Sequence, residues 1–174
     1  SLNKISADIH PLGAMIIKDF LSKPSDVKAD IVACLLNAMS LWTNPVIDYA
    51  TSASDFDISS FNQAPTTLYI GVQPHELELL QPLLKIFYQY AFDVLMHNIN
   101  ADRIPVSFYL DDFVSVGKIS NLTSVLNYGR GYKIRLFIVA QNLEELKEVY
   151  EKSITKAIVF NSLYRLCFMT ESYK

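Results

Sequence analysis

The sequence is poor in cysteine and histidine, and both shortages exclude common kinds of site. Cys34 and Cys167 lie in apolar stretches without C-x-x-C spacing, so neither a disulfide framework nor a zinc site is expected. The three histidines, His10, His75 and His97, are scattered and lack the spacing of metal ligands. Buried thiols in a reducing compartment are therefore the expectation.

Positive charge and long apolar runs are also scarce. The net charge of −3 gives no bulk attraction to nucleic acid or to an anionic membrane. Polar residues interrupt the longest apolar stretch, 79–96, which predicts an amphipathic helix and not a membrane span. The 174 residues are 51% hydrophobic, enough for one domain or for a piece of a larger one. No signal peptide is visible and the chain starts at Ser1, so we expect a cut or processed piece.

Short β-rich runs alternate with helical patterns after residue 66. The expected strands are 67–72, 105–110, 134–140 and 165–169. The expected helices are 12–21, 26–42 (with Ser25 as N-cap), 75–96 (with a start or kink at Pro82), 118–129 and 143–152; 156–160 fits either type, and 43–66 is a connector. Strands apolar on both faces predict an α/β fold with a mainly parallel sheet covered by helices on both sides.

Polar residues follow two of these strands at the point where each ends. Asp111 and Asp112 follow 105–110, and Gln141 and Asn142 follow 134–140. The carboxyl ends of parallel strands meet at one edge, where such sheets bind ligands, so this edge is a candidate metal-nucleotide site. The alternative is that Asp111 caps the following loop and Gln141 caps the next helix.

Glycine is too rare to build a phosphate-binding loop. The motif G-x-x-x-x-G-K-[ST] would need its first glycine at residue 112, which is Asp, and Ser or Thr at residue 119, which is Ile. Gly129 and Gly131 have no third glycine and do not open a helix, so the dinucleotide fingerprint is absent as well. The carboxylate pair has no nucleotide-binding loop within this sequence.

Four ordered motifs do resemble a known family. "LDDF", "VGKI", "RGYKI" and "IVAQN" follow the order and nearly the spacing of motifs in type IV secretion coupling proteins, the TraG/TraD-like conjugation ATPases related to the FtsK/HerA DNA pumps. The resemblance implies part of a RecA-like P-loop NTPase fold. It implies that residues 61–174 form the C-terminal half of the nucleotide-binding domain, and that residues 1–60 are a helical segment and connector that end an inserted all-helical domain.

The resemblance also implies roles for four residues in phosphoryl transfer. Asp111 matches the Walker B aspartate that holds Mg²⁺ through water, and Asp112 matches the catalytic glutamate that polarises the attacking water. Gln141 matches the glutamine that senses the γ-phosphate. Arg130 matches an arginine finger that acts on a neighbouring subunit's nucleotide. Two residues depart from the family pattern: Asp112 is one methylene shorter than Glu, and Lys133 replaces a glycine.

The function implied is part of a coupling ATPase that recruits and drives DNA or protein substrates to the secretion channel. The parent would use Mg²⁺ and ATP, form a hexameric ring at the cytoplasmic face of the bacterial inner membrane, and bind relaxosome or effector proteins and other secretion components. Lacking the Walker A loop, this chain alone is predicted to be inactive and to bind neither cofactor. The alternative is a non-catalytic docking module for relaxosome or effector proteins.

Three further features favour simpler interpretations. The aromatic stretch 86–92 has helical spacing, which favours core packing over base stacking. The basic cluster at 129–135 fits a subunit interface better than phosphate contacts. Ser115 and Ser120 have no histidine in register, so nothing supports a hydrolase triad.

Overall fold

The computed structural model describes residues 10–97 and 102–168, which divide into two compact units, Ser1–Ala53 and Ser54–Lys174. This division lies seven residues before the boundary expected from the sequence. The origin of the first unit in an inserted helical domain stays a prediction. Among the described helices, none combines the length and the apolar character needed to cross a membrane.

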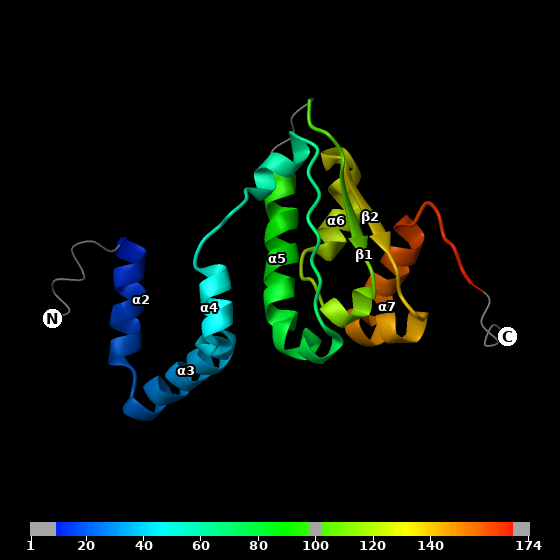
Figure 1. Ribbon diagram of the computed structural model, residues 1–174. Helices are drawn as coiled ribbons and strands as arrows, with labels where there is room; N and C mark the ends of the chain where they lie inside the picture. Colours follow the sequence, from blue (N-terminus) through cyan, green and yellow to red (C-terminus); the bar gives the residue numbers. More distant parts are fainter. Residues whose placement is uncertain (1–9, 98–101, 169–174) are drawn as a thin grey trace. The chain divides into compact units, whose positions relative to one another are not determined.

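The first unit is helical, as the sequence predicts. It contains α2 (Pro11–Ser22), α3 (Ser25–Ala38), the 3₁₀ turn η1 (Ser40–Thr43) and α4 (Pro45–Thr51) (Figure 1). Ser25 is the first residue of α3 and Pro24 is its N-cap, so the expected cap is one residue off. The connector predicted from residue 43 is also wrong in part, because Asn44 caps α4 by accepting a hydrogen bond from the Val46 N–H.

The second unit is a short parallel sheet with three main helices. The strands are β1 (Val106–Leu110) and β2 (Ile134–Ile138), and the helices are α5 (Leu77–His97), α6 (Leu122–Tyr128) and α7 (Leu143–Asn161). The 3₁₀ turns are η2 (Ile58–Asn62), η3 (Pro74–Glu76), η4 (Phe113–Val116) and η5 (Gly129–Tyr132). The strands pair in parallel from Val106 opposite Ile134 to Leu110 opposite Ile138, which confirms the expected parallel sheet.

Two predicted strands are not formed. Residues 67–72 and the described part of 165–169, which ends at residue 168, are extended but belong to no ladder within the described ranges. Their composition suits a strand, but a strand also requires hydrogen bonds to a partner, and within the described ranges neither segment pairs with the free edge of β1 or of β2.

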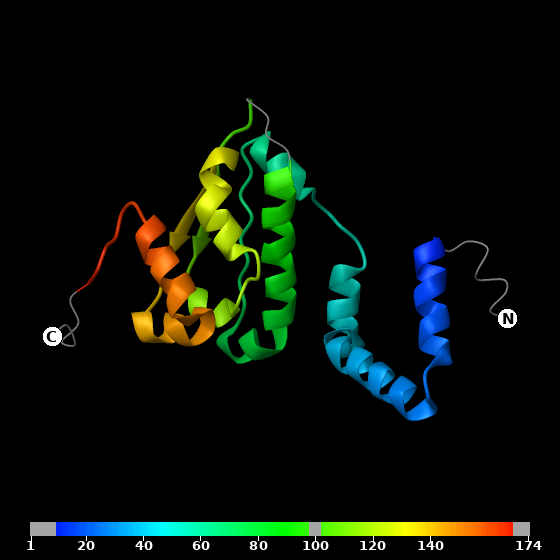
Figure 2. The same cartoon turned by 180° about the vertical axis from the view of Figure 1, so that it is seen from behind.

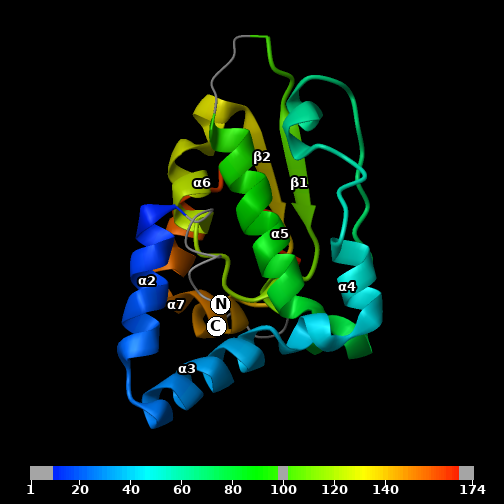
Figure 3. The ribbon, with the colours of Figure 1, turned by 90° about the vertical axis from the view of Figure 1, so that its left-hand side faces the viewer.

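Helices cover one face of the sheet and leave the other exposed, so the expectation of cover on both faces is wrong for this chain. Seen from behind, α6 and α7 lie in front of the strands (Figure 2), and α5 runs beside them (Figure 3). Phe92 of α5 packs on Phe108 of β1 with ring centroids 4.7 Å apart. On the other face, Tyr109 and Phe137 stack on each other at 4.4 Å, with 73% and 46% of their surface exposed.

The helices of this unit differ in extent from the prediction. Helix α5 starts five residues before Pro82, which lies inside it. Helix α6 is shorter than the expected 118–129. Helix α7 continues through 156–160, which are therefore helical, across a break at Glu151, where φ is 63°.

Candidate active site

The two strands deliver their polar residues to the same edge of the sheet. The ladder continues past its last residue pair, since the Val139 N–H donates to the Leu110 carbonyl at 3.0 Å and the Phe113 N–H donates to the Val139 carbonyl at 3.0 Å. Asp111 and Asp112 therefore form the turn that closes over Val139, and Gln141 lies two residues further along. The structure thus places these three predicted residues at the same end of the sheet.

The turn conformation separates the surroundings of the two carboxylates. Asp112 adopts the left-handed conformation (φ 46°, ψ 49°), which Asp tolerates better than most residues. The Ser115 hydroxyl donates to Asp112 Oδ2, and Asp112 is partly buried. Asp111 is exposed, and its Oδ1 accepts from the Asp112 N–H at 3.1 Å. Asp111 thus faces solvent with its second oxygen available.

Gln141 does not cap α7, so the part of the alternative interpretation that makes it a helix cap is wrong. Asn142 caps α7: its Oδ1 accepts from the Glu145 N–H at 2.8 Å, and its Nδ2 donates to Glu145 Oε1. Gln141 is exposed and makes no side-chain hydrogen bond within the described part of the chain. Its amide is therefore available to a ligand at the strand edge.

The loop after the carboxylates is fixed onto α5. Gly117 has a φ of +76°, and a Cβ placed there would lie 2.5 Å from Lys85 Cε. Lys85 Nζ donates to Gln81 Oε1 at 2.7 Å, and Gln81 Nε2 donates to the Ser115 carbonyl at 3.2 Å. The positive φ of Gly117 thus favours glycine in the "VGKI" motif, while the nearest atoms are the flexible ends of Lys85 and Gln81.

Tyr150 of α7 holds the same loop from the other side. Its buried hydroxyl donates to the Gly117 carbonyl at 2.9 Å and accepts from the Ile119 N–H at 3.2 Å. Its ring stacks on Phe113 with centroids 5.1 Å apart. Burial raises the pKa of Tyr150 to about 12.

Replacing Tyr150 by Phe keeps the stacking but leaves the Gly117 carbonyl and the Ile119 N–H without their partner. We expect the free energy of unfolding to fall by about 1–3 kcal/mol. Because the folded-state pKa lies above the ordinary value of 10.0, the wild type should also lose stability as pH rises from 10 to about 12, and Tyr150→Phe should lack this component. Urea unfolding at neutral and alkaline pH measures both. An unchanged unfolding free energy at pH 7 would contradict the role.

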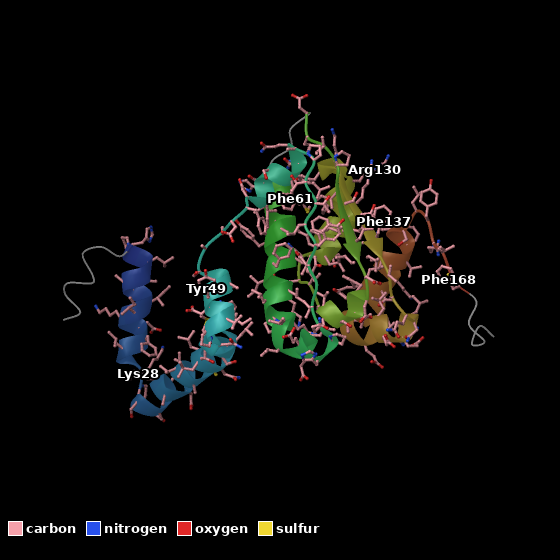
Figure 4. All side chains as sticks on the ribbon, in the orientation of Figure 1. Lys28, Tyr49, Phe61, Arg130, Phe137 and Phe168 are labelled. Atoms are coloured by element: carbon pink, nitrogen blue, oxygen red, sulfur yellow. The ribbon has the colours of Figure 1, made fainter. Side chains whose placement is uncertain are left out.

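Arg130 lies at the other end of the sheet from the carboxylates. It is an exposed residue of η5, just before β2 begins, whereas Gln141 follows the end of β2. Figure 4 shows Arg130 at the upper end of β2, and the arrowhead of β1 in Figure 1 points to the lower end. A five-residue strand spans roughly 17 Å, more than an arginine side chain reaches. The structure does not bring Arg130 to its own Asp111.

Metal-binding clusters are absent from the described residues: no group of three or more His, Cys, Asp or Glu side chains could hold an ion. A single carboxylate that binds Mg²⁺ through water needs no such cluster, and Asp111 fits that role because it is an exposed oxygen donor at the sheet edge. The aromatic stretch 86–92 contributes Phe92 to the core, as expected from its spacing.

The sequence analysis missed three structural roles near this site. Ser115 was considered only as a nucleophile, although its spacing of three residues from Asp112 is typical of a side-chain turn contact. Lys133 was noted only for its charge, but its φ of 56° explains why the family pattern has glycine there. Tyr150 gave no local signal, because its partners lie more than 30 residues away.

The paired carboxylates and the strand-end amide lie at the carboxyl ends of parallel strands, which is the edge where open α/β sheets bind ligands. A family described as "Type IV secretory system Conjugative DNA transfer" matches residues 1–173, and the chain belongs to this family.

Individual relatives agree with this assignment. Protein VirD4 of Rhizobium rhizogenes is 30% identical over 66% of this chain and 17% of its own length. Conjugal transfer protein TraG of Escherichia coli is 26% identical over 79% of this chain and 23% of its own length. The solved structure of the bacterial conjugative coupling protein TrwBdeltaN70 shares the fold, with a TM-score of 0.55 and 21% identity over 62% of this chain and 26% of that one. The chain thus spans less than a quarter of the length of VirD4 and of TraG. Its fold is a partial α/β fold.

Proposed function

We propose that this chain is the part of a type IV secretion coupling ATPase that carries the hydrolytic carboxylates, and that the whole protein drives DNA or protein substrates to the secretion channel. The observation that carries the proposal is the strand-end edge, where Asp111, Asp112 and Gln141 converge. Family membership gives the coupling role, and the edge gives the chemistry.

Each residue of the edge has a part in ATP hydrolysis. Asp111 would hold Mg²⁺ through water, and the ion would supply positive charge that neutralises the phosphates. Asp112 accepts a hydrogen bond from Ser115 through Oδ2, which orients its other oxygen towards an attacking water. Gln141 donates its amide to the γ-phosphate. Arg130 is too far to act on the same nucleotide, so it acts on that of a neighbouring subunit.

The assembly and location are also part of the proposal. A finger that acts between subunits requires a neighbouring subunit, and we propose that the subunits form a hexameric ring. The ring would stand at the cytoplasmic face of the inner membrane, where relaxosome or effector proteins deliver DNA or protein to other secretion components.

The second candidate is a docking module for relaxosome or effector proteins, without turnover. The upstream reading frame of the natural gene discriminates the two. The ATPase proposal expects G-x-x-x-x-G-K-[ST] and two membrane helices to be encoded there. An upstream frame without that loop would leave only the docking function.

The isolated chain is expected not to hydrolyse ATP and not to bind it tightly. The edge carries two carboxylates, which repel the phosphates, and the sequence has no glycine-rich loop and lysine to offset them. Calorimetric titration of residues 1–174 with Mg-ATP should show no binding in the micromolar range. Micromolar affinity would mean that the chain contains a complete nucleotide site elsewhere.

A further inference from the structure

Arg103 is a buried cation next to the turn that carries Arg130. Only 6% of its surface is exposed. Its Nη1 donates to the Leu95 carbonyl at 2.9 Å and to the Tyr132 carbonyl at 3.4 Å. With the Asn62 amide oriented to satisfy its neighbours, Asn62 Oδ1 accepts from Arg103 Nη2 at 3.3 Å. One guanidinium therefore joins the C-terminal turn of α5, η2 and η5.

A contact in the opposite direction completes this arrangement. Lys133 Nζ donates to the Arg103 carbonyl at 2.8 Å, and the Val106 N–H donates to the Lys133 carbonyl at 3.1 Å. Lys133 adopts a positive φ of 56°, which few residues other than glycine do. We call the reciprocal contact between Arg103 and residues 132–133 the Arg103 clasp.

The clasp fixes the backbone of Arg130 without touching its side chain. The Lys133 N–H donates to the Arg130 carbonyl at 3.1 Å, so the clasp and Arg130 belong to one turn. Gly129, the residue before, is buried, and a Cβ placed there would lie 3.2 Å from Val125 Cγ1. The Arg130 side chain itself is exposed and makes no hydrogen bond or ion pair within the described residues.

Burying a guanidinium costs free energy of folding. Proteins in which hydrophobic residues replace buried ionic groups are often as stable as the original protein, or more stable. Stability alone is therefore a weak reason for Arg at position 103. We propose that Arg103 is a positioning residue that holds the η5 turn so that Arg130 extends towards the nucleotide of a neighbouring subunit. This inference rests on the proposed ATPase function.

The test uses mixed assemblies of the full-length protein. Arg103→Met keeps the length of the side chain and removes its donors, so kcat should fall about 10- to 100-fold, the effect of a misplaced catalytic group, while the KM for ATP stays within about twofold. Arg103→Lys, which keeps a donor, should recover part of the rate. Thr155→Val serves as a control, because it removes a buried hydroxyl in α7 whose donation to the Leu146 carbonyl lies outside the clasp.

Complementation separates positioning from folding. Arg103→Met subunits should recover ATPase when mixed with Asp111→Asn subunits, which supply a well-placed finger, but should not recover it with Arg130→Ala subunits. Wild-type kcat in Arg103→Met, or recovery with Arg130→Ala, would overturn the proposal. The proposal would also be overturned if Arg103→Met subunits did not recover activity with Asp111→Asn subunits while Arg130→Ala subunits did. If Arg130→Ala subunits also failed to recover activity with Asp111→Asn subunits, Arg130 would not act between subunits, and this inference would be wrong as well. If Arg103→Met does not fold, Lys133→Met replaces it in the test, because Lys133 is an exposed residue of the clasp. Lys133→Met must then give the same pattern of recovery.

Discussion

Replacing Asp111 by Asn in the full-length protein should lower ATP turnover by about 10²- to 10³-fold, the scale of losing one electrostatic partner in a catalytic site. The substitution removes the charge that holds Mg²⁺ through water and keeps the volume of the side chain. Asp111 is exposed and contributes one local hydrogen bond, so the thermal midpoint should change little. Steady-state ATPase and thermal unfolding on the same preparation measure both.

Asp112 provides the matched comparison one residue later. Asp112→Glu restores the usual reach of the family and should keep or raise the rate, although the left-handed backbone favours Asp slightly. Asp112→Asn should be inactive, because an amide cannot accept the proton of the attacking water. An inactive Asp112→Glu beside an active Asp112→Asn would show that this residue does not position the water.

Arg130→Ala should lower turnover by about 10³-fold, the lower end of the effect of an arginine finger. The side chain is exposed and has no hydrogen bond or ion pair with any described residue, so its loss should not unfold the protein. Subunits with Arg130→Ala and subunits with Asp111→Asn are each inactive alone. When the two are co-assembled, some interfaces pair an intact carboxylate edge with an intact arginine, and ATPase should partly return.

The recovery expected in mixed rings depends on the length of β2. Since that strand separates Arg130 from the edge of its own subunit, no rearrangement of the side chain alone can bring the guanidinium there. Proven mixed rings without any recovery would reject the action between subunits. In that case Arg130 would be a surface residue of η5.

The parallel pair and its polar edge were predictable from the sequence. Residues 105–110 and 134–140 are short runs rich in β-branched and aromatic residues, and the helical pattern between them requires a crossover and so a parallel pairing. Asp111, Asp112 and Gln141 follow these runs, so their common edge is a consequence of topology. The family resemblance gave these residues their roles.

What the sequence could not predict depends on contacts between distant residues. Residues 67–72 have the composition of a strand, but composition does not supply a partner edge. The prediction of Gln141 as a possible cap failed because Asn142 competes for the same position and reaches the Glu145 N–H. The burial of Arg103 could not be predicted, because charged residues are usually exposed and its neighbours in the sequence give no sign that it packs against η5.

The most direct test is an experimental structure of the full-length protein with Mg²⁺ and a non-hydrolysable ATP analogue. We expect the γ-phosphate to lie at the strand-end edge of one subunit, with Asp111 bound to the ion through water and Gln141 at the phosphate. The Arg130 guanidinium next to that phosphate should belong to the adjacent subunit. A nucleotide bound away from Asp111, or contacted by the Arg130 of the same subunit, would contradict the account.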